Sequence, residues 1–480
     1  MRRNFPINFV TAPLIADLFL LAILAISRQE VHDGTLGSDG IVPIDIMAFF
    51  LTLAYIAISI DASGIIRWLA FKVLQKAGKN GRRLYLYLYM FFFALASFIG
   101  NDPIVLSGTA FLAYMTRVAS NIETPEAWIH TQFAIANIGS AILVSSNPTN
   151  LVLAGAFGIK FIVYTANIIV PVVVTVIILY PFLRYNVFRG KGKIPKSIDM
   201  HQLDLKDQQK EAVNPNIPNA AYTRGDAAKD SEQEKTLSLE EIMNPFLDKK
   251  GAGFGAFIMA TTLITILALN AASQSTGEHP VYWVTLPAAG VMFCWDVASG
   301  WLDREKTRKV ARDGRDKRHE FEAAKRQAAE EHEKRDAEEQ QTSAPPSERL
   351  GKGADEQISS HSSHVVSGLP SDSDQDVETG TKAVETVGQR STLVSVIRDA
   401  YTWSQETFPT VTAVLTHLPW ALVPFALAMF VLVQALATKG WITVFAHGWD
   451  HWVTKTGTVG AIGGMGFISV VMCNVGLHHY

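Results

Sequence analysis

Cysteine is scarce in this sequence, whose 480 residues include only Cys294 and Cys473. Two cysteines in separate apolar segments provide neither a disulfide framework nor the paired spacing of a zinc site. An excess of one charge is also lacking, since 42 basic residues face 45 acidic ones and the formal net charge is −3. We therefore expect no metal site and no nucleic-acid partner, because nucleic-acid-binding proteins carry a clear basic surface.

Motifs of common enzyme classes are missing as well. The sequence has no nucleophile elbow, no phosphate-binding glycine loop and no zinc signature at a usable spacing. We therefore expect that the protein is not an enzyme and has no cofactor.

Long apolar runs are what the sequence has instead. Hydrophobic residues make up 48% of the chain, and a helix of about 20 apolar residues spans the hydrocarbon core of a bilayer. Long apolar runs recur at about 7–27, 41–66, 84–115, 127–158, 161–183, 252–272, 281–297 and 417–437. We predict an all-α polytopic membrane protein whose first run is a retained helix, because it lacks a convincing signal-peptide cleavage site.

Basic residues predict the orientation of these segments, because loops rich in Lys and Arg stay on the cytoplasmic side. Segment 67–83 carries six basic residues and no acidic one, and a second basic segment begins at Arg184. Both are predicted to be cytoplasmic, so an even number of crossings must separate them, whereas three apolar runs lie between. The number of crossings becomes even if 84–115 is a re-entrant hairpin that enters and leaves the membrane on one side.

Two long polar stretches interrupt the membrane part. The first is rich in Lys, Asp, Gln and Asn; the second begins as a charged helix and continues into a Ser-rich part with too few core-forming residues to fold. We interpret both as flexible connectors, with phosphorylation of the Ser-rich part as the alternative. The predicted organisation is a first membrane repeat at 1–185, a polar cytoplasmic loop at 186–250, membrane helices at 251–300, a largely disordered cytoplasmic loop at 301–415 and the start of a second repeat at 416–480.

An internal repeat is indicated by two matching segments, 48–73 and 424–449. Each has an apolar helix, a polar break, a glycine and a second amphipathic helix with a Trp near its start, and Gly64 and Gly440 occupy the matching place. The charge rule gives the two copies opposite orientations, as in many secondary transporters, whose sites lie at the repeat interface. Continuing the alignment brings Asn474 into register with Asn101.

Polar residues inside the apolar runs form the candidate site. In "SFIGNDPIVLSG" the only charged residue of the predicted hairpin, Asp102, lies between Asn101 and Pro103. A carboxylate at membrane depth is costly and is usually functional. The alternative for Asp102 is a buried, hydrogen-bonded structural acid. Asp61 is predicted equally as a site residue or a helix cap, and Asp17, Asp45 and Asp296 are predicted to be interfacial.

The second polar group is "ANIGSAILVSSNPTNLVLAG", in which Pro148 interrupts a predicted helix. A helix broken by proline exposes carbonyls that suit a cation, and the N-terminus of its second half suits an anion. The alternative is a kinked helix without a ligand. Candidate substrate- and ion-binding residues are Asn101, Asp102, Thr109, Asn137, Ser145, Ser146, Asn147, Thr149, Asn150 and Asn474, with helix breaks at Gly100, Pro103 and Pro148.

These two motifs resemble those of the ion transporter superfamily, specifically its citrate-transporter-like and arsenical-pump membrane proteins. In that family a re-entrant hairpin carries a short polar tip, which Asn101 and Asp102 match, and a broken helix carries a Ser-Asn-Pro-x-Asn motif, which residues 146–150 match. The stretch "LPWALVPFALAMFVLVQAL", residues 418–436, is similar to the helix that opens the family's second repeat. The resemblance covers about 1–190, 250–300 and 415–475.

The resemblance implies an inverted-repeat secondary active transporter of an anion or oxyanion, either citrate- or dicarboxylate-like or arsenite, coupled to H⁺ or Na⁺. It also implies an elevator motion and a second repeat that is incomplete, because the family's second hairpin continues past the position of Asn474, whereas this sequence stops at Tyr480. Two alternatives stay open. One is a sodium/proton antiporter on the same scaffold, and the other is a truncated, non-transporting membrane protein that acts through a partner.

The expected environment is an integral, multi-pass position in a lipid bilayer, with the plasma membrane as the first choice and the long loops in the cytoplasm. The expected ligand is a small anionic or oxyanion substrate, and a homodimer is the candidate assembly.

Overall fold

The computed structural model describes residues 7–38, 41–119, 121–122, 124–157, 159–190, 192–198, 212–223, 244–272, 280–342 and 392–475. Within these residues the secondary structure is helical, apart from two isolated β-bridges, which confirms the all-α class. Helices long and apolar enough to cross a membrane are Pro43–Ala62, Gly81–Ile99, Phe161–Val187, Lys249–Leu269 and Pro409–Thr438. Helix α1 (Thr11–Ala22) is shorter than the predicted spanning helix at 7–27, because the chain turns at Leu24, whose φ is +59°.

The chain forms two compact units, Met1–Arg318 with Ser404–Tyr480, and His319–Trp403. In the second unit, the described residues are the distal part of α13 (Tyr282–Thr342) and the first part of α14 (Leu393–Thr407). The charged Ala-, Glu-, Lys- and Arg-rich stretch at the start of the range 301–415 is helical, as predicted, since it consists of good helix formers. Residues 343–391 lie outside the described part.

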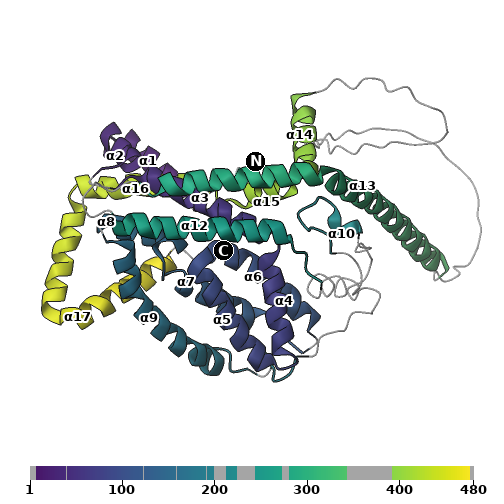
Figure 1. Cartoon of the computed structure of the whole chain (residues 1–480), viewed down its shortest axis with the longest axis horizontal. Coiled ribbons are helices and arrows are strands. Elements are labelled where there is room, and N and C mark those ends of the chain that lie inside the picture. The colour runs from purple at the N-terminus through teal and green to yellow at the C-terminus, as the bar shows by residue number, and fades with distance from the viewer. Residues whose placement is uncertain are drawn as a thin grey trace, which may run out of the picture. The chain divides into compact units, whose positions relative to one another are not determined.

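Helix α3 (Pro43–Ala62) is the most buried of the candidate spans. It packs against α12 (Lys249–Ala272) and α15 (Pro409–His417), and α3 and α12 run alongside the start of α13 (Figure 1). Hydrogen bonds add to this apolar packing, because the Thr52 hydroxyl donates to Thr285 Oγ1 at 2.7 Å. Helix α3 is therefore a central helix against which α12, α15 and the start of α13 pack.

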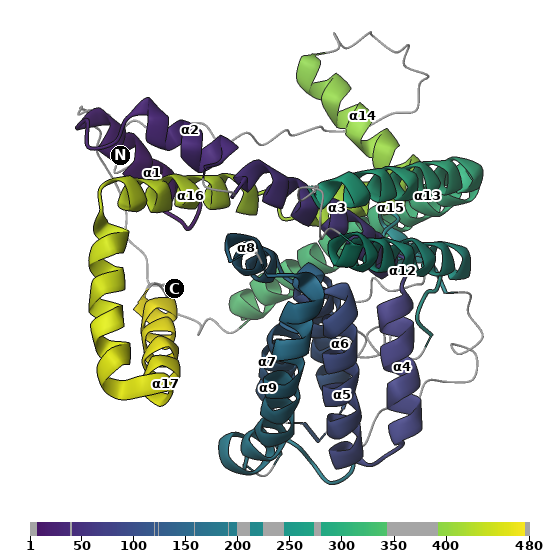
Figure 2. The ribbon, with the colours of Figure 1, turned by 60° about the vertical axis from the view of Figure 1, so that its left-hand side comes forward.

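A second group of helices lies side by side in Figure 2. It consists of α4 (Ile65–Ala77), α5 (Gly81–Ile99), α6 (Asn101–Val118), α7 (Glu126–Gly139) and α9 (Phe161–Phe182). Their shared core contains the buried rings of Tyr85, Tyr89 and Trp128. Polar ends of these rings are paired, as the Tyr89 hydroxyl donates to the Val176 carbonyl at 2.7 Å, which avoids an unpaired polar group in an apolar core.

The start of α5 and the end of α6 both contact the same short segment, residues 193–198. The Gly81 amide, at the start of α5, donates to the Lys196 carbonyl at 3.0 Å. The Asn121 side chain, just after α6, donates to the Ser197 carbonyl. Helices α5 and α6 therefore form a hairpin whose ends lie together, and the basic segment 67–83 is hydrogen-bonded to the basic segment that follows Arg184.

The matching segments of the internal repeat have the same local geometry. Gly64 joins α3 to α4 with a φ of +83°, and Gly440 joins α16 (Leu422–Thr438) to α17 (Trp441–Val475) with a φ of +79°. A second left-handed glycine follows in each copy, Gly78 before α5 and Gly457 inside α17. Figure 2 shows α17 bending back on itself. The inverted relation of the copies to a membrane stays a prediction.

Candidate functional site

The tip of the hairpin is Gly100, whose φ of +105° lies in a region that favours glycine. Helix α5 ends at Ile99 and α6 begins at Asn101, so the chain reverses over one residue. Pro103 fits the first turn of α6, where its missing N–H costs no helical hydrogen bond. The sequence therefore places the amide of Asn101 and the carboxylate of Asp102 at a helix N-terminus.

The second break separates α7, which ends at Gly139, from α8 (Pro148–Ala156). A short 3₁₀ turn and an extended Asn147, with a φ of −153°, connect them. The Asn147 carboxamide oxygen accepts from the Thr149 amide at 2.9 Å and so caps the start of α8. The Asn150 side chain donates to the carbonyls of Ser140 and Leu143 at 2.8 and 2.9 Å, which satisfies acceptors that the break has freed.

The hairpin tip and the helix break are in contact. The Ser146 hydroxyl donates to the Ser97 carbonyl at 2.7 Å, and the Asn101 amide donates to the Asn137 carboxamide oxygen at 3.1 Å. A Cβ atom added to Gly100 would lie 3.0 Å from the Ser146 carbonyl oxygen, so this close approach depends on glycine. Two polar motifs that are about 45 residues apart thus form one site.

A narrow cavity of about 30 Å³ lies where they meet. The N-terminal residues of α6 and residues 145–147 line one side, and Asp102 is the only charged side chain among the lining residues. The N-termini of α6 and α8 adjoin this space, and helix N-termini favour negative charge. The cavity lining consists of Phe49, Phe50, Leu53, Ala54, Ala57, Ile99, Gly100, Asn101, Asp102, Pro103, Ser145, Ser146 and Asn147.

Not every predicted site residue lines this cavity. Thr109 lies further along α6 and donates to Gln132 at 3.0 Å, and Thr149 is exposed on α8. Asn137 and Asn150 hold the two breaks in shape through the hydrogen bonds given above. Asn474 lies near the end of α17, and its side chain is outside the described residues, as is the ring of Pro148.

Sequence analysis missed the apolar wall of α3 and the buried Gln132. The Gln132 amide donates to the Ile104 carbonyl at 2.7 Å, and its oxygen accepts from Thr109, so this side chain ties α6 to α7. The only signal was an amide within an apolar run. The wall on α3 gave no signal, because apolar residues of a membrane helix look alike whether they face a cavity, lipid or protein.

Asp17 and Asp296, which the sequence predicts to be interfacial, are both buried within the protein. The Asp296 carboxylate accepts from the Tyr55 hydroxyl at 3.0 Å and from the Ser59 hydroxyl at 2.8 Å. These donors lie on α3, more than 200 residues earlier, so sequence spacing gives no indication of them.

Comparison with known proteins finds one matching family and several similar membrane proteins. The sequence profile of a family described as "Citrate transporter" matches residues 7–477. The "Arsenical pump membrane protein" of Escherichia coli strain K12 is 28% identical over 180 residues, 37% of this chain and 41% of that protein. The "Putative arsenical pump membrane protein" of Bacillus subtilis strain 168 is 24% identical over 178 residues, 37% of this chain and 40% of that protein. The match thus spans about 40% of the length of these relatives.

Proposed function

The chain belongs to the citrate transporter family, and from this premise we propose that it is a secondary active transporter of a small anion or oxyanion. The family is one of transporters, and the chain is an integral, multi-pass membrane protein. The observation that carries the proposal is the meeting of hairpin tip and helix break in one cavity. Irregular backbone at membrane depth is tolerated where it lines a cavity, and transporters use such breaks for substrate and ions.

The chemistry of the cavity supports an anion together with a coupling cation. Two helix N-termini supply partial positive charge for the anion. Asp102 supplies the single negative charge, which suits H⁺ or Na⁺ bound at the same time. Among anions, we propose citrate or a dicarboxylate from the family description and arsenite from the relatives' names as the two classes to test.

Reconstitution of the purified chain in liposomes tests the proposal. Exchange of radiolabelled citrate, and separately of arsenite, is measured without a gradient and then with an imposed pH or sodium gradient. Asp102→Asn keeps the shape of the side chain but removes its charge, so we expect gradient-driven flux to fall to background. Asp45→Asn is the matched control, because Asp45 also occupies the first turn of a helix.

Unchanged gradient-driven flux in Asp102→Asn would contradict the role of this carboxylate. Absence of exchange of either substrate by the unmodified chain would contradict the transporter proposal itself. Sodium-driven proton movement without any anion flux would instead favour the sodium/proton antiporter.

We propose the cytoplasmic side for the end of the helix group where the basic segments 67–83 and 184–196 meet. A homodimer, and an alternative role through a partner chain, are also proposals. Native mass spectrometry of the purified protein in detergent tests both.

A further inference from the structure

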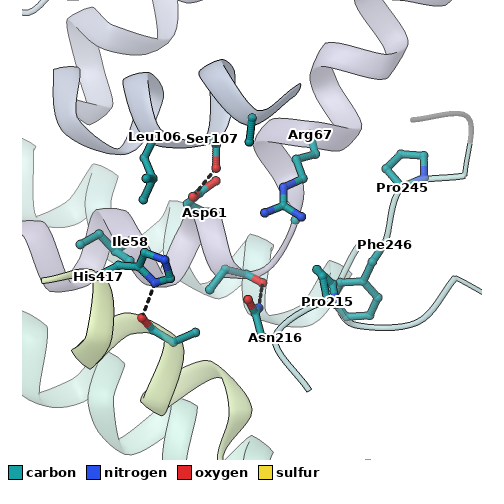
Figure 3. A pocket seen from close by; sticks show the side chains of 14 residues that line it. Ile58, Asp61, Arg67, Leu106, Ser107, Pro215, Asn216, Pro245, Phe246 and His417 are labelled. Carbon is teal, nitrogen blue, oxygen red and sulfur yellow. Dashed lines mark hydrogen bonds between the residues drawn. The ribbon is translucent and has the colours of Figure 1, made fainter. Parts of the chain in front are cut away.

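A second and larger cavity, of about 180 Å³, lies one helical turn further along α3 and α6 (Figure 3). It is bounded by the end of α3, the start of α4, the middle of α6 and the end of α15, and by residues 215–216 and 245–246. Asp61 of α3 and Ser107 of α6 point toward each other there, and the Ser107 hydroxyl donates to Asp61 Oδ2. This hydrogen bond connects α3 with the limb that carries Asp102 at its start.

The other carboxylate oxygen of Asp61 is unusual. Asp61 Oδ1 is inaccessible to solvent and has no hydrogen-bond partner among the described residues. A buried carboxylate oxygen without a donor is costly, because nothing replaces the water that it loses. The contrast with Asp296 is clear, since both oxygens of Asp296 accept hydrogen bonds from hydroxyl groups.

Two basic side chains face the same cavity, Arg67 from α4 and His417 from α15 (Figure 3). His417 Nδ1 lies 2.7 Å from the Ala413 carbonyl, so it carries a proton and donates it there. This leaves Nε2 as the nitrogen that can accept a hydrogen bond. The remaining lining segments, 215–216 and 245–246, contribute only Pro, Asn and Phe side chains.

This set of groups favours a proton over a metal cation. A metal cation at Asp61 would be repelled by the guanidinium of Arg67. A proton placed on Oδ1 neutralises the buried carboxylate and so removes most of the cost of an oxygen without a donor. We propose that this cavity is a proton-binding site, in which Asp61 takes up and releases the proton that drives transport.

The link to the substrate cavity is α6. Ser107 follows Asp102 by ~8 Å along the helix axis, at 1.5 Å per residue. When Asp61 is ionised, its hydrogen bond from Ser107 is charge-assisted and roughly twice as strong as a neutral one. Protonation at Oδ1 therefore weakens the connection between α3 and the hairpin, and deprotonation restores it, with no covalent bond made or broken apart from that to the proton.

This inference rests on the proposed function only for what the proton drives, so its first test does not depend on transport. Dicyclohexylcarbodiimide reacts with protonated carboxylic acids in apolar surroundings, and peptide mass spectrometry locates the product. We expect labelling of Asp61 in the unmodified, liposome-reconstituted chain to increase as the pH falls. Asp45, on the same helix, is the internal reference for labelling of a residue outside the cavity. Absence of label on Asp61 at every pH overturns the proposal.

The second test compares exchange with gradient-driven uptake for Asp61→Asn, using radiolabelled citrate and arsenite. We expect exchange to persist, while uptake driven by a pH gradient falls to the level seen without a gradient; Asp45→Asn is expected to behave like the unmodified chain. Gradient-driven uptake that stays intact in Asp61→Asn overturns the proposal. If the unmodified chain transports neither substrate, yet Asp61 is labelled as the pH falls, the transporter proposal fails and the proton-binding site stands.

Discussion

The two copies of the repeated segment have the same turns but different surroundings. In the first copy, Gly64 lies against the backbone of residue 246, and the Asp248 amide donates to the Ser63 carbonyl at 2.9 Å. In the second copy, no atom of the described residues, apart from the adjoining backbone, lies within 4 Å of where a Gly440 side chain would begin. None of the α17 side chains that the structure describes is buried, whereas α4 and α5 contribute much of a hydrophobic core.

This difference shows that the glycine turns depend on the local sequence alone, whereas the burial of the helices depends on tertiary contacts. A left-handed glycine needs no tertiary contact, because the absence of a Cβ atom already permits its φ. The recurrence of positive φ at Gly64 and Gly440, and again at Gly78 and Gly457, is therefore a property of the sequence around each turn. The packing of α4 and α5 requires neighbours that bury their side chains, and none of the described α17 side chains is buried.

The largest effect on this comparison is expected from Gly64→Ala. Alanine pays ~1–2 kcal/mol for a left-handed conformation, and its Cβ would lie 2.2 Å from the Phe246 carbonyl oxygen. Overpacking of this kind costs about 1–3 kcal/mol more, so we expect a large loss of folded protein. The measurement is thermal unfolding of the purified variant in detergent, followed by tryptophan fluorescence.

Gly440→Ala is expected to have a smaller effect, and it is the matched control for Gly64→Ala. The left-handed conformation costs the same ~1–2 kcal/mol, but no overpacking against the part of the chain that the structure describes is added, because none of its atoms lies within 4 Å of the new Cβ atom. The same unfolding measurement should rank the two variants in this order. Equal destabilisation would mean that Gly440 is in contact with something other than the residues described, and the comparison of the two copies would have to be revised.

The same distinction explains what could be predicted from the sequence. The hairpin tip and the helix break could be predicted from the sequence, because Gly100, Pro103 and Pro148 change the backbone within one or two residues of their own positions. Thr109 and Thr149 do not line the cavity. Helix periodicity alone does not show which residue either side chain contacts. The hydrogen-bond partners of Asp61 and Asp296 could not be predicted from the sequence. Ser107, Tyr55 and Ser59 come into contact with these carboxylates only when the helices pack together.

The smallest expected effect on stability concerns the ion pair beside the Gly440 turn, between Lys439 and Glu30. Lys439, next to Gly440, lies 3.3 Å from Glu30 at the start of α2 (Arg28–Leu36). Hydrogen bonds from Ser27, first its hydroxyl and then its amide, lower the pKa of Glu30 from 4.5 to about 2, and Lys439 contributes least. Because the pKa is lower in the folded state, this stabilisation is present above pH 4.5 and is lost as the pH falls toward 2.

We therefore expect the melting temperature of Glu30→Gln to lie slightly below that of the unmodified chain at neutral pH and to converge with it at acidic pH. Ser27→Ala should reproduce most of this difference and Lys439→Met little of it, because the capping hydroxyl and amide outweigh the ion pair. A larger loss for Lys439→Met would show that the second turn is held by its ion pair with α2. In that case both copies would have turns fixed by tertiary contacts, the first through the backbone of residue 246 and the second through a side-chain charge.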